Sequence, residues 1–213
     1  MHALVPANDV SLSPGTWPAM ATLAPSSSMM DLGGSRGMPG ERAAFALSAE
    51  TAGDVAPRDL LLDRAMAPNW RRKSSEKIRK GRAPALAFVA RDDSGAVVGT
   101  VRLWSVSAGE GGREALLLGP LAVDPALRSA GIGGALMRHA IVEAQRAGHA
   151  AILLVGDPAY YARFGFSAEK TGCLAMPGPF EKHRLLAVEL KPGALGSCAG
   201  VIRPTGRKVE RAA

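Results

Sequence analysis

The chain has 213 residues, of which 47% are apolar and 21% charged, and its 26 Lys and Arg against 19 Asp and Glu give a formal net charge of +7. This composition is ordinary for a soluble globular protein and excludes collagen-like, coiled-coil and disulfide-scaffold proteins. The length favours one domain over two, because domains commonly hold about 100–200 residues. No apolar run reaches the roughly 18–20 residues that a membrane helix needs, so the sequence predicts no membrane span.

The two cysteines, Cys173 and Cys198, have neither a C-x-x-C spacing nor a histidine pattern near them. We interpret them as small apolar side chains of a protein in a reducing compartment, the cytoplasm. On this interpretation we expect no metal site.

The excess positive charge lies in two segments. Residues 71–82 carry seven Lys and Arg with one Glu, and residues 203–211 carry four basic residues with one Glu, so the rest of the chain is slightly negative. Basic segments can bind nucleic acid, but Trp70 is the only ring near the first one, and stacking of single strands is therefore poorly supported. We treat a nucleic-acid-binding module as the weaker hypothesis.

Residues 1–40 differ from the rest in composition. They are rich in Ser, Pro, Ala, Gly and Met, contain Arg36 as their only Lys or Arg, and show no hydrophobic period. Two interpretations stay open: a disordered extension, or a start-site error in which translation begins at a later Met. We expect the folded domain at residues 41–205 and a basic tail at 206–213.

The first predicted helix covers residues 54–66. Asp54 is placed to cap its N-terminus, Pro57 falls in the first turn, and the leucines at 60–62 would supply the buried side. The other elements predicted before residue 105 are a strand at 42–47, a short helix capped by Ser74 or Ser75, and a hairpin of strands at 85–91 and 96–104 joined by a turn at 92–95.

A third strand is predicted at residues 115–123, with Gly119-Pro120 inside it. Proline cannot donate a hydrogen bond to a neighbouring strand, so this strand should bulge or splay at that point.

The second half of the domain predicts a helix at 131–147, in which apolar residues recur at i, i+3 and i+4, with Gly148 suited to end it. Residues 150–155 are all apolar, as in a buried parallel strand. A meander followed by a helix and a parallel strand indicates one α/β domain with a mixed sheet. The remaining elements are a short helix at 158–164, a strand at 185–190 and further β structure up to residue 203.

The segment 121–135 is typical of an anion site. A strand leads into a loop with Arg128 and the glycines 131, 133 and 134, and this loop opens onto the predicted helix. Free N–H groups at a helix N-terminus, together with the helix dipole, attract phosphate, and glycines let the backbone approach it. A Walker loop is excluded because Ala135 follows the last glycine, and the spacing does not fit a dinucleotide fingerprint. The alternative is that the glycines only permit close helix–strand packing.

Residues 128–133 (Arg-Ser-Ala-Gly-Ile-Gly) match every fixed position of the motif Arg/Gln-x-x-Gly-x-Gly/Ala. This motif starts the central helix of the Gcn5-related N-acetyltransferase (GNAT) superfamily, which the chain resembles. Tyr161, followed by Gly165-Phe166, strengthens the resemblance. The segments LLLGPLAVDP, GDPAYYARFGF and LKPGAL resemble one bacterial subgroup, the YhbS-type acetyltransferases, and the resemblance covers about residues 41–205.

The resemblance implies a GNAT fold: an α/β domain with a mixed, mostly antiparallel sheet, central splayed parallel strands and flanking helices. Acetyl-CoA, the cosubstrate, would lie between the strands at 115–123 and 150–155. The N–H of Leu121 would stabilise the oxyanion that forms on the thioester. The implied cofactor-binding residues are Leu121, Ala122 and Val123 for the pantetheine, and Arg128, Ser129, Ala130, Gly131, Ile132, Gly133 and Gly134 for the pyrophosphate.

The implied reaction is direct attack of a primary amine on the thioester in a ternary complex, without a covalent intermediate. Tyr161 stands at the family's position for the acid that protonates the CoA thiolate, and Tyr160 is the competing assignment. Many relatives have Asn at the start of this helix, where the chain has Gly156-Asp157-Pro158. We therefore leave Asp157 out of the cofactor-binding set.

Three features stay open. The general base is Glu114, His183 or water. The acceptor is a small molecule or a protein amine; in the family the region of residues 71–82 lines its side of the site. A homodimer is possible, and a catalytically silent acyl-CoA-binding member of the fold is a further hypothesis.

Overall fold

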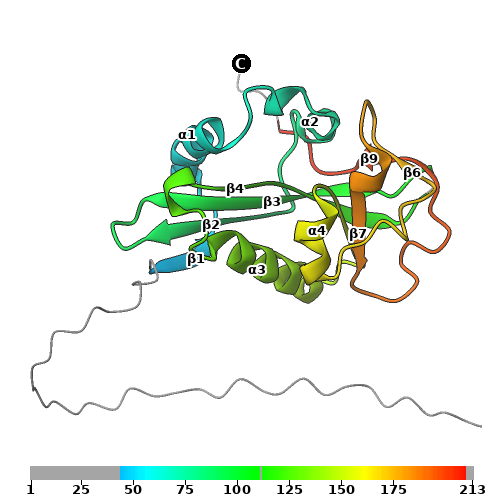
Figure 1. The fold of residues 1–213 in the computed structure, drawn as a ribbon. Coiled ribbons are helices and arrows are strands. Elements are labelled where there is room, and N and C mark those ends of the chain that lie inside the picture. Colours follow the sequence, from blue (N-terminus) through cyan, green and yellow to red (C-terminus); the bar gives the residue numbers. More distant parts are fainter. Residues whose placement is uncertain (1–43, 111, 210–213) are drawn as a thin grey trace, which may run out of the picture. The chain divides into compact units, whose positions relative to one another are not determined.

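A mixed β-sheet organises the computed structural model, which describes residues 44–110 and 112–209 (Figure 1). The predicted extension at residues 1–40 and the last four residues of the predicted tail lie outside the described residues. All strand pairs of the main sheet are antiparallel except β4–β5. The sheet order is β1 (Phe45–Ala49), β2 (Leu86–Asp92), β3 (Val97–Ser107), β4 (Glu114–Val123), β5 (Ala151–Val155) and β7 (Leu185–Glu189), with β9 (Arg203–Pro204) also paired to β3.

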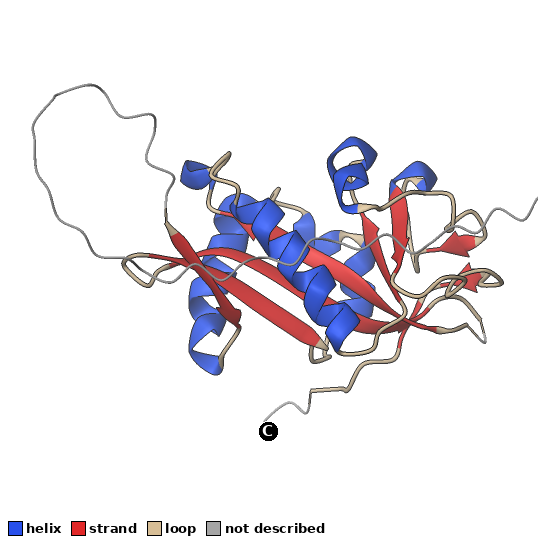
Figure 2. Ribbon diagram, turned by 90° about the horizontal axis from the view of Figure 1, so that it is seen from below, coloured by secondary structure: helices blue, strands red, loops and turns tan. Residues whose placement is uncertain are grey.

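The helices lie on the two faces of this sheet (Figures 1 and 2). On one face lie α1 (Val55–Ala65) and α2 (Ser74–Arg79); on the other, α3 (Ile132–Arg146) crosses the strands and α4 (Pro158–Tyr161) follows β5. The predicted α/β class with a mixed sheet is confirmed. A two-stranded parallel sheet of β6 (Leu174–Ala175) and β8 (Gly200–Val201) was not predicted, because two-residue strands carry no alternation.

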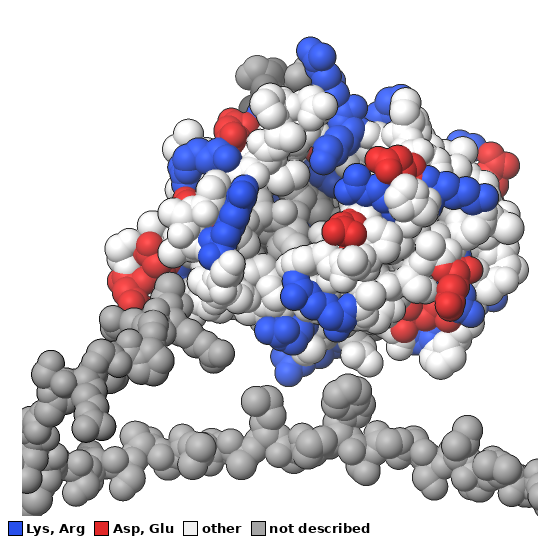
Figure 3. Space-filling view, in the orientation of Figure 1, with Lys and Arg blue, Asp and Glu red and all other residues white. Residues whose placement is uncertain are grey.

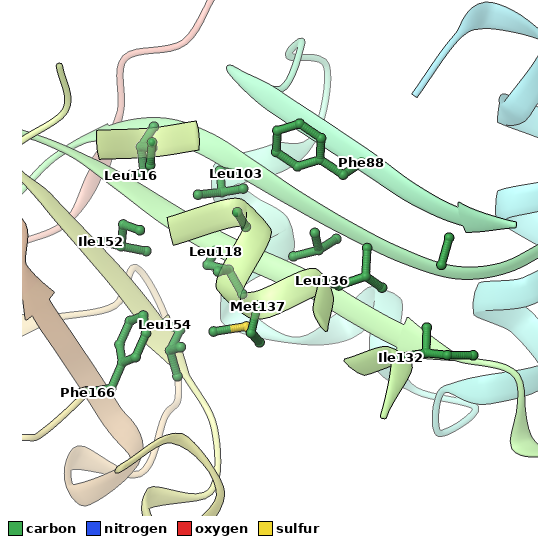
Figure 4. Packing of buried hydrophobic residues seen from close by; sticks show 14 of the residues in the cluster. Phe88, Leu103, Leu116, Leu118, Ile132, Leu136, Met137, Ile152, Leu154 and Phe166 are labelled. Carbon is green, nitrogen blue, oxygen red and sulfur yellow. The ribbon is translucent and has the colours of Figure 1, made fainter. Parts of the chain in front are cut away.

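The largest core cluster lies between the sheet and α3 (Figure 4). Because side chains alternate along a strand, Leu116 and Leu118 of β4 point to this cluster, whereas Leu117 belongs to the cluster on the α2 side with Ile78. The helix contributes Leu136 and its neighbours from one buried stripe. Both faces of the central strands are thus covered, which explains their nearly continuous apolar sequences.

Two predictions around α1 need correction. Asp54 occupies the predicted N-cap position of α1, but it ends a 3-10 turn at Ala52–Asp54, and its carboxylate accepts hydrogen bonds of 2.8 Å from the N–H and the hydroxyl of Thr51 rather than from an amide of α1. This capping box holds the chain before the helix. Leu60 is 62% exposed, so only the next two leucines are buried, as the 100° step between helix residues requires.

Two element boundaries also differ from prediction. The first strand is β1 at Phe45–Ala49, shifted toward the C-terminus because its pairing with β2 sets its ends. Ser74 and Ser75 are the first two residues of α2, and Lys73 occupies the N-cap position without a side-chain cap.

The third strand contains the predicted bulge. Leu103 pairs with Leu118 and Val101 pairs with Leu121, so two residues of β4 lie opposite one of β3. The two residues of β4 at the bulge are Gly119 and Pro120, which are joined by a cis peptide bond. The insertion switches which side chains face α3, from the even-numbered residues before it to Leu121 after it.

Gly99 of β3 lets the N-terminal turn of α3 lie directly on the sheet. A Cβ at this position would come within 2.8 Å of Cγ2 of Ile132 and 2.9 Å of Cδ1 of Leu136, and both side chains are fully buried. The helix can therefore sit at its present height only if residue 99 has no side chain.

We expect Gly99→Val to lower the free energy of unfolding by about 1–3 kcal/mol, because added methyl groups overpack a dense core. Urea denaturation measures this. Gly172→Val is the matched control, since a Cβ there meets nothing within 4 Å and should change stability little. Equal effects of the two variants would contradict the assigned packing.

Candidate active site

The central feature of the site is a gap between β4 and β5. These strands pair only through Leu116 with Ile152 and Leu117 with Leu153. Beyond these pairs the strands separate, and a cavity of about 540 Å³ opens there. Its wall comes from the ends of the strands (118–121 and 154–157), from the α1–α2 region (Met66, Trp70, Lys73, Ser74, Ser75, Arg79), from α4 (Tyr160, Tyr161) and from the segment before β7 (Pro179, Phe180, Glu181, Arg184).

The bulge of β4 is held in place by Trp104. The indole Nε1 of this buried residue donates a 2.6 Å hydrogen bond to the carbonyl oxygen of Gly119. Gly119 has φ of 127°, a conformation that side chains rarely allow. The backbone at the gap therefore has a defined position before any ligand binds.

A second cavity, of about 500 Å³, lies at the N-terminus of α3. Its wall includes Arg128, Arg138 and Arg163, and no carboxylate among the described residues contributes to it. Ser129 and Gly131 have positive φ, of 76° and 84°, and make the tight turn into the helix. A cavity with this charge favours anions such as phosphate.

Most backbone amides of this turn are free to bind a ligand. Between residues 128 and 134 only Ala130 donates to another backbone group, to Leu127 at 3.2 Å, and the first helical hydrogen bond joins Ala135 to Gly131. Among the described residues, we find no acceptor for the amides of Arg128, Ser129, Gly131, Ile132, Gly133 and Gly134. Six unpaired donors at a helix N-terminus can bind an anion, in keeping with the prediction from the glycine pattern.

The structure therefore brings Leu121 to the first cavity, and Val123 and the 128–134 turn to the second, except for Ala130, which packs against the core on the α3 side. Ala122 lines neither cavity; its buried side chain packs with Leu62 and Trp70 on the α1 side.

The two tyrosines lie where the cavities meet. Tyr160 lines both cavities, whereas Tyr161 lines only the one at the strand gap, and their rings meet edge to face at 4.9 Å. A Cβ at Gly156 would lie 2.2 Å from Cε2 of Tyr161, so the absence of a side chain there makes room for that ring. Burial raises the pKa of Tyr161 to about 12, with a further contribution from Tyr160.

Asp157 has a local structural role. Its carboxylate accepts a 3.1 Å hydrogen bond from the N–H of Ala159 and caps α4, and Pro158 follows in the first turn. This cap sets the start of the short helix that carries both tyrosines.

Neither predicted candidate for the general base lines the strand gap. Glu114 is exposed at the start of β4, opposite Ser107 and four residues before the gap begins. His183 is also exposed, and its Nε2 lies 3.6 Å from Oε2 of Glu181. The carboxylates in the cavity wall are those of Asp157 and Glu181.

The basic segment 71–82 is not one solvated face. Arg71 stacks on Trp70, with its guanidinium carbon 4.3 Å from the ring centroid, and pairs with Asp63. Arg79 lines the cavity, and Arg82 donates to the carbonyl oxygen of Gly206 at 2.5 Å. Three of the seven cations are thus engaged within the domain. Figure 3 shows a hollow in the face of the molecule seen in Figure 1, with Lys and Arg side chains along its border.

Several cavity residues were missed from the sequence. Arg138 lies one helical turn after Gly134, so its spacing from the motif could have indicated it. Arg163 stacks on Tyr160 at 4.0 Å, a contact that no sequence pattern signals. Arg79 and Trp70 reach the cavity only through the tertiary fold.

Two kinds of feature, a metal-ligand cluster and a membrane-spanning helix, are absent from residues 44–110 and 112–209. No group of three or more His, Cys, Asp or Glu side chains there could hold a metal ion. No helix in that part of the chain is long and apolar enough to span a membrane. Both cysteines are free thiols, of which Cys198 is buried and Cys173 is exposed.

Comparison with known families supports the class that this geometry defines. Residues 83–168 match the family model described as an acetyltransferase (GNAT) domain. The chain has the GNAT fold, with helices on both faces of a mixed sheet whose parallel pair separates. The resemblance to the GNAT superfamily that the sequence predicts is confirmed.

Within this class the chain is similar to YhbS-type proteins. It is 29% identical over 149 residues to an uncharacterized N-acetyltransferase, YhbS, of Escherichia coli K12, a match that covers 70% of this chain and 89% of the relative. The crystal structure of E. coli YhbS in complex with CoA matches with a TM-score of 0.67 at 27% identity, over 78% of this chain and 93% of that one. A GNAT family acetyltransferase of Brucella melitensis in complex with acetyl-CoA matches with a TM-score of 0.52 at 27% identity, over 68% of this chain and 96% of that one.

Proposed function

We propose that the protein is an acetyltransferase that moves an acetyl group from acetyl-CoA to a primary amine. The observation that carries this proposal is the gap between β4 and β5. It adjoins a second cavity, whose wall has three arginines and a turn with six amides that are unpaired among the described residues. The E. coli and B. melitensis structures with CoA and acetyl-CoA support the choice of cosubstrate.

The cosubstrate would lie along both cavities. Its pyrophosphate accepts hydrogen bonds from the amides of residues 128–134, and Arg128 adds a cation. Its pantetheine lies beside Leu121, Ala122 and Val123, where β4 no longer pairs with β5, and backbone groups can bind it as they would a further strand. This places the thioester near the bulge at Gly119.

The residues of the chain then act on the reaction in three ways. The fixed backbone of the bulge orients the thioester, and the N–H of Leu121 stabilises the oxyanion as the amine attacks. Tyr161 donates a proton to the sulfur of the departing CoA. Burial raises the pKa of Tyr161 to about 12, so the phenol is protonated at neutral pH and available as the donor. Water, Asp157 or Glu181 would accept the proton that the amine loses, since Glu114 and His183 lie outside the cavity wall.

The proposal includes the setting of the reaction. We infer a domain at residues 41–205 that works in the cytoplasm of a bacterium, in keeping with two free thiols and with the bacterial relatives. A homodimer stays a prediction. The hypothesis that residues 71–82 bind nucleic acid is less well supported, because Arg71, Arg79 and Arg82 in this segment are engaged with other parts of the domain.

Acetyl-CoA should raise the melting temperature of the protein. A hundredfold excess over Kd adds about 2.7 kcal/mol of stability, which a thermal melt detects as a shift of several degrees. Gly133→Glu should abolish the shift, because it adds a carboxylate at the phosphate site, on ordinary helical backbone.

Gly172→Glu is the charge-matched control and should keep the shift, since residue 172 lies outside both cavities. No shift of the unchanged protein at millimolar acetyl-CoA would refute the proposal.

Tyr161→Phe should lower kcat by about a hundredfold or more while leaving the melting shift with acetyl-CoA intact, because general acid catalysis is worth roughly 10²–10⁴. Tyr160→Phe should keep kcat within a few-fold. Release of free thiol, followed with an amine panel, measures both. A larger loss in Tyr160→Phe would assign the proton to Tyr160 instead.

A further inference from the structure

Arg79 is a buried cation with unused hydrogen-bond donors. Its side chain is only 11% exposed, and its ion pair is with Glu76, 3.1 Å from Nη1. Nε is buried and has no hydrogen-bond partner among residues 44–110 and 112–209. A guanidinium has five N–H donors, so this one contact leaves most of them free. Burial also lowers the pKa of Arg79, which shows that its charge has lost much of its hydration.

The free end of Arg79 lies at the strand gap. Nη2 would be 3.1 Å from a Cβ at Gly119, and no acceptor for Nη2 is found among the described residues. Because Gly119 has no side chain, the guanidinium reaches the backbone of the bulge itself. Arg79 comes from α2, on the face of the sheet opposite α3, so it lies away from the turn proposed to hold the pyrophosphate.

The other charged groups of this cavity are already paired or exposed. Arg184 donates to the carbonyl oxygen of Gly156 at 3.2 Å and pairs with Glu181 at 3.4 Å. Asp157 caps α4, and Lys73 is exposed at the rim. The remaining wall near α2 consists of the apolar side chains of Met66, Trp70 and Phe180 and the uncharged hydroxyls of Ser74 and Ser75. The desolvated guanidinium is therefore the strongest recognition group inside this part of the cavity.

We propose that the acceptor is a small amine that also carries a carboxylate, and that Arg79 binds this carboxylate. This inference rests on the proposed function. Arg and a carboxylate match in geometry through two parallel hydrogen bonds, and such a pair gains strength where water is excluded. The ligand thus supplies the partner that the buried cation lacks.

The position of Arg79 also limits the size of the acceptor. Gly119, beneath the guanidinium, is two residues from Leu121, which we place at the thioester, and two residues span at most roughly 7 Å even in a fully extended chain. The amine that attacks the thioester and the carboxylate that binds Arg79 must therefore be separated by only a few bonds. A short amino acid fits this requirement, whereas the side-chain amine of a protein lysine does not carry such a carboxylate.

The direct test compares acceptors that differ only in this group. Glycine, β-alanine, 4-aminobutyrate and phenylalanine are each assayed against the corresponding carboxamide, with acetyl-CoA and thiol release as readout. For the preferred acceptor we expect kcat/KM at least tenfold higher for the carboxylate, mainly through KM. Arg79→Gln should reduce this ratio to within about twofold without changing the melting shift with acetyl-CoA.

Two further variants control the result. Arg79→Lys keeps the charge but not the paired donors, so its preference should be intermediate. Lys77→Gln removes a charge from the same helix outside the cavity wall and should leave the ratio unchanged. An Arg79→Gln variant that retains the full preference for carboxylates would overturn the inference.

A binding experiment separates this inference from the proposed function. With CoA bound, phenylacetate should raise the melting temperature and phenylacetamide should not, and Arg79→Gln should remove the difference. If amines are acetylated without preference for a carboxylate, the inference fails and the proposed function stands. If acetyl-CoA does not bind, the proposed function fails. In that case, equal effects of phenylacetate and phenylacetamide on the melting temperature of the unchanged protein overturn the inference as well.

Discussion

The site depends on the end of strand pairing at one bulge in β4. Two residues, Gly119 and Pro120, lie opposite a single residue of β3, and the parallel ladder to β5 stops after Leu117 and Leu153. A continuous ladder would fill the space that is now a cavity of about 540 Å³. The indole of Trp104 holds the carbonyl of Gly119, so the gap is part of the folded structure and does not need a ligand to open it.

The second requirement is that the N-terminus of α3 borders a cavity that meets the strand gap at Tyr160. Gly99 lets the first turn of the helix lie on the sheet, and the turn at Ser129 and Gly131 leaves six amides without partners. Unpaired amides are unfavourable unless water or a ligand satisfies them, so this turn is able to bind an anion. Tyr160 borders both cavities, so the cavity at the strand gap and the cavity at the N-terminus of α3 meet at its side chain.

The sequence predicts those features that depend on local physics. The periodic helix after Gly131, the buried strand at 151–155 and the interruption at Gly119-Pro120 follow from spacing and backbone chemistry, and the turn amides follow from the glycine motif. Arg79, Trp70 and Arg163 could not be predicted as cavity residues, because tertiary packing alone brings them there. The exposure of Leu60 was missed because three successive leucines cannot all face one side of a helix, and the role of Asp54 was missed because a 3-10 turn precedes α1.

Amide hydrogen exchange, followed residue by residue with and without acetyl-CoA, tests the central claim that the gap and the adjacent turn hold the cosubstrate. We predict that saturating acetyl-CoA slows exchange at the unpaired amides of residues 128–134 and at Leu121, in the wall of the strand gap, and leaves the pairing of β1 with β2 unchanged. Saturation of the protein by acetyl-CoA with no change in exchange at residues 128–134 would contradict the account.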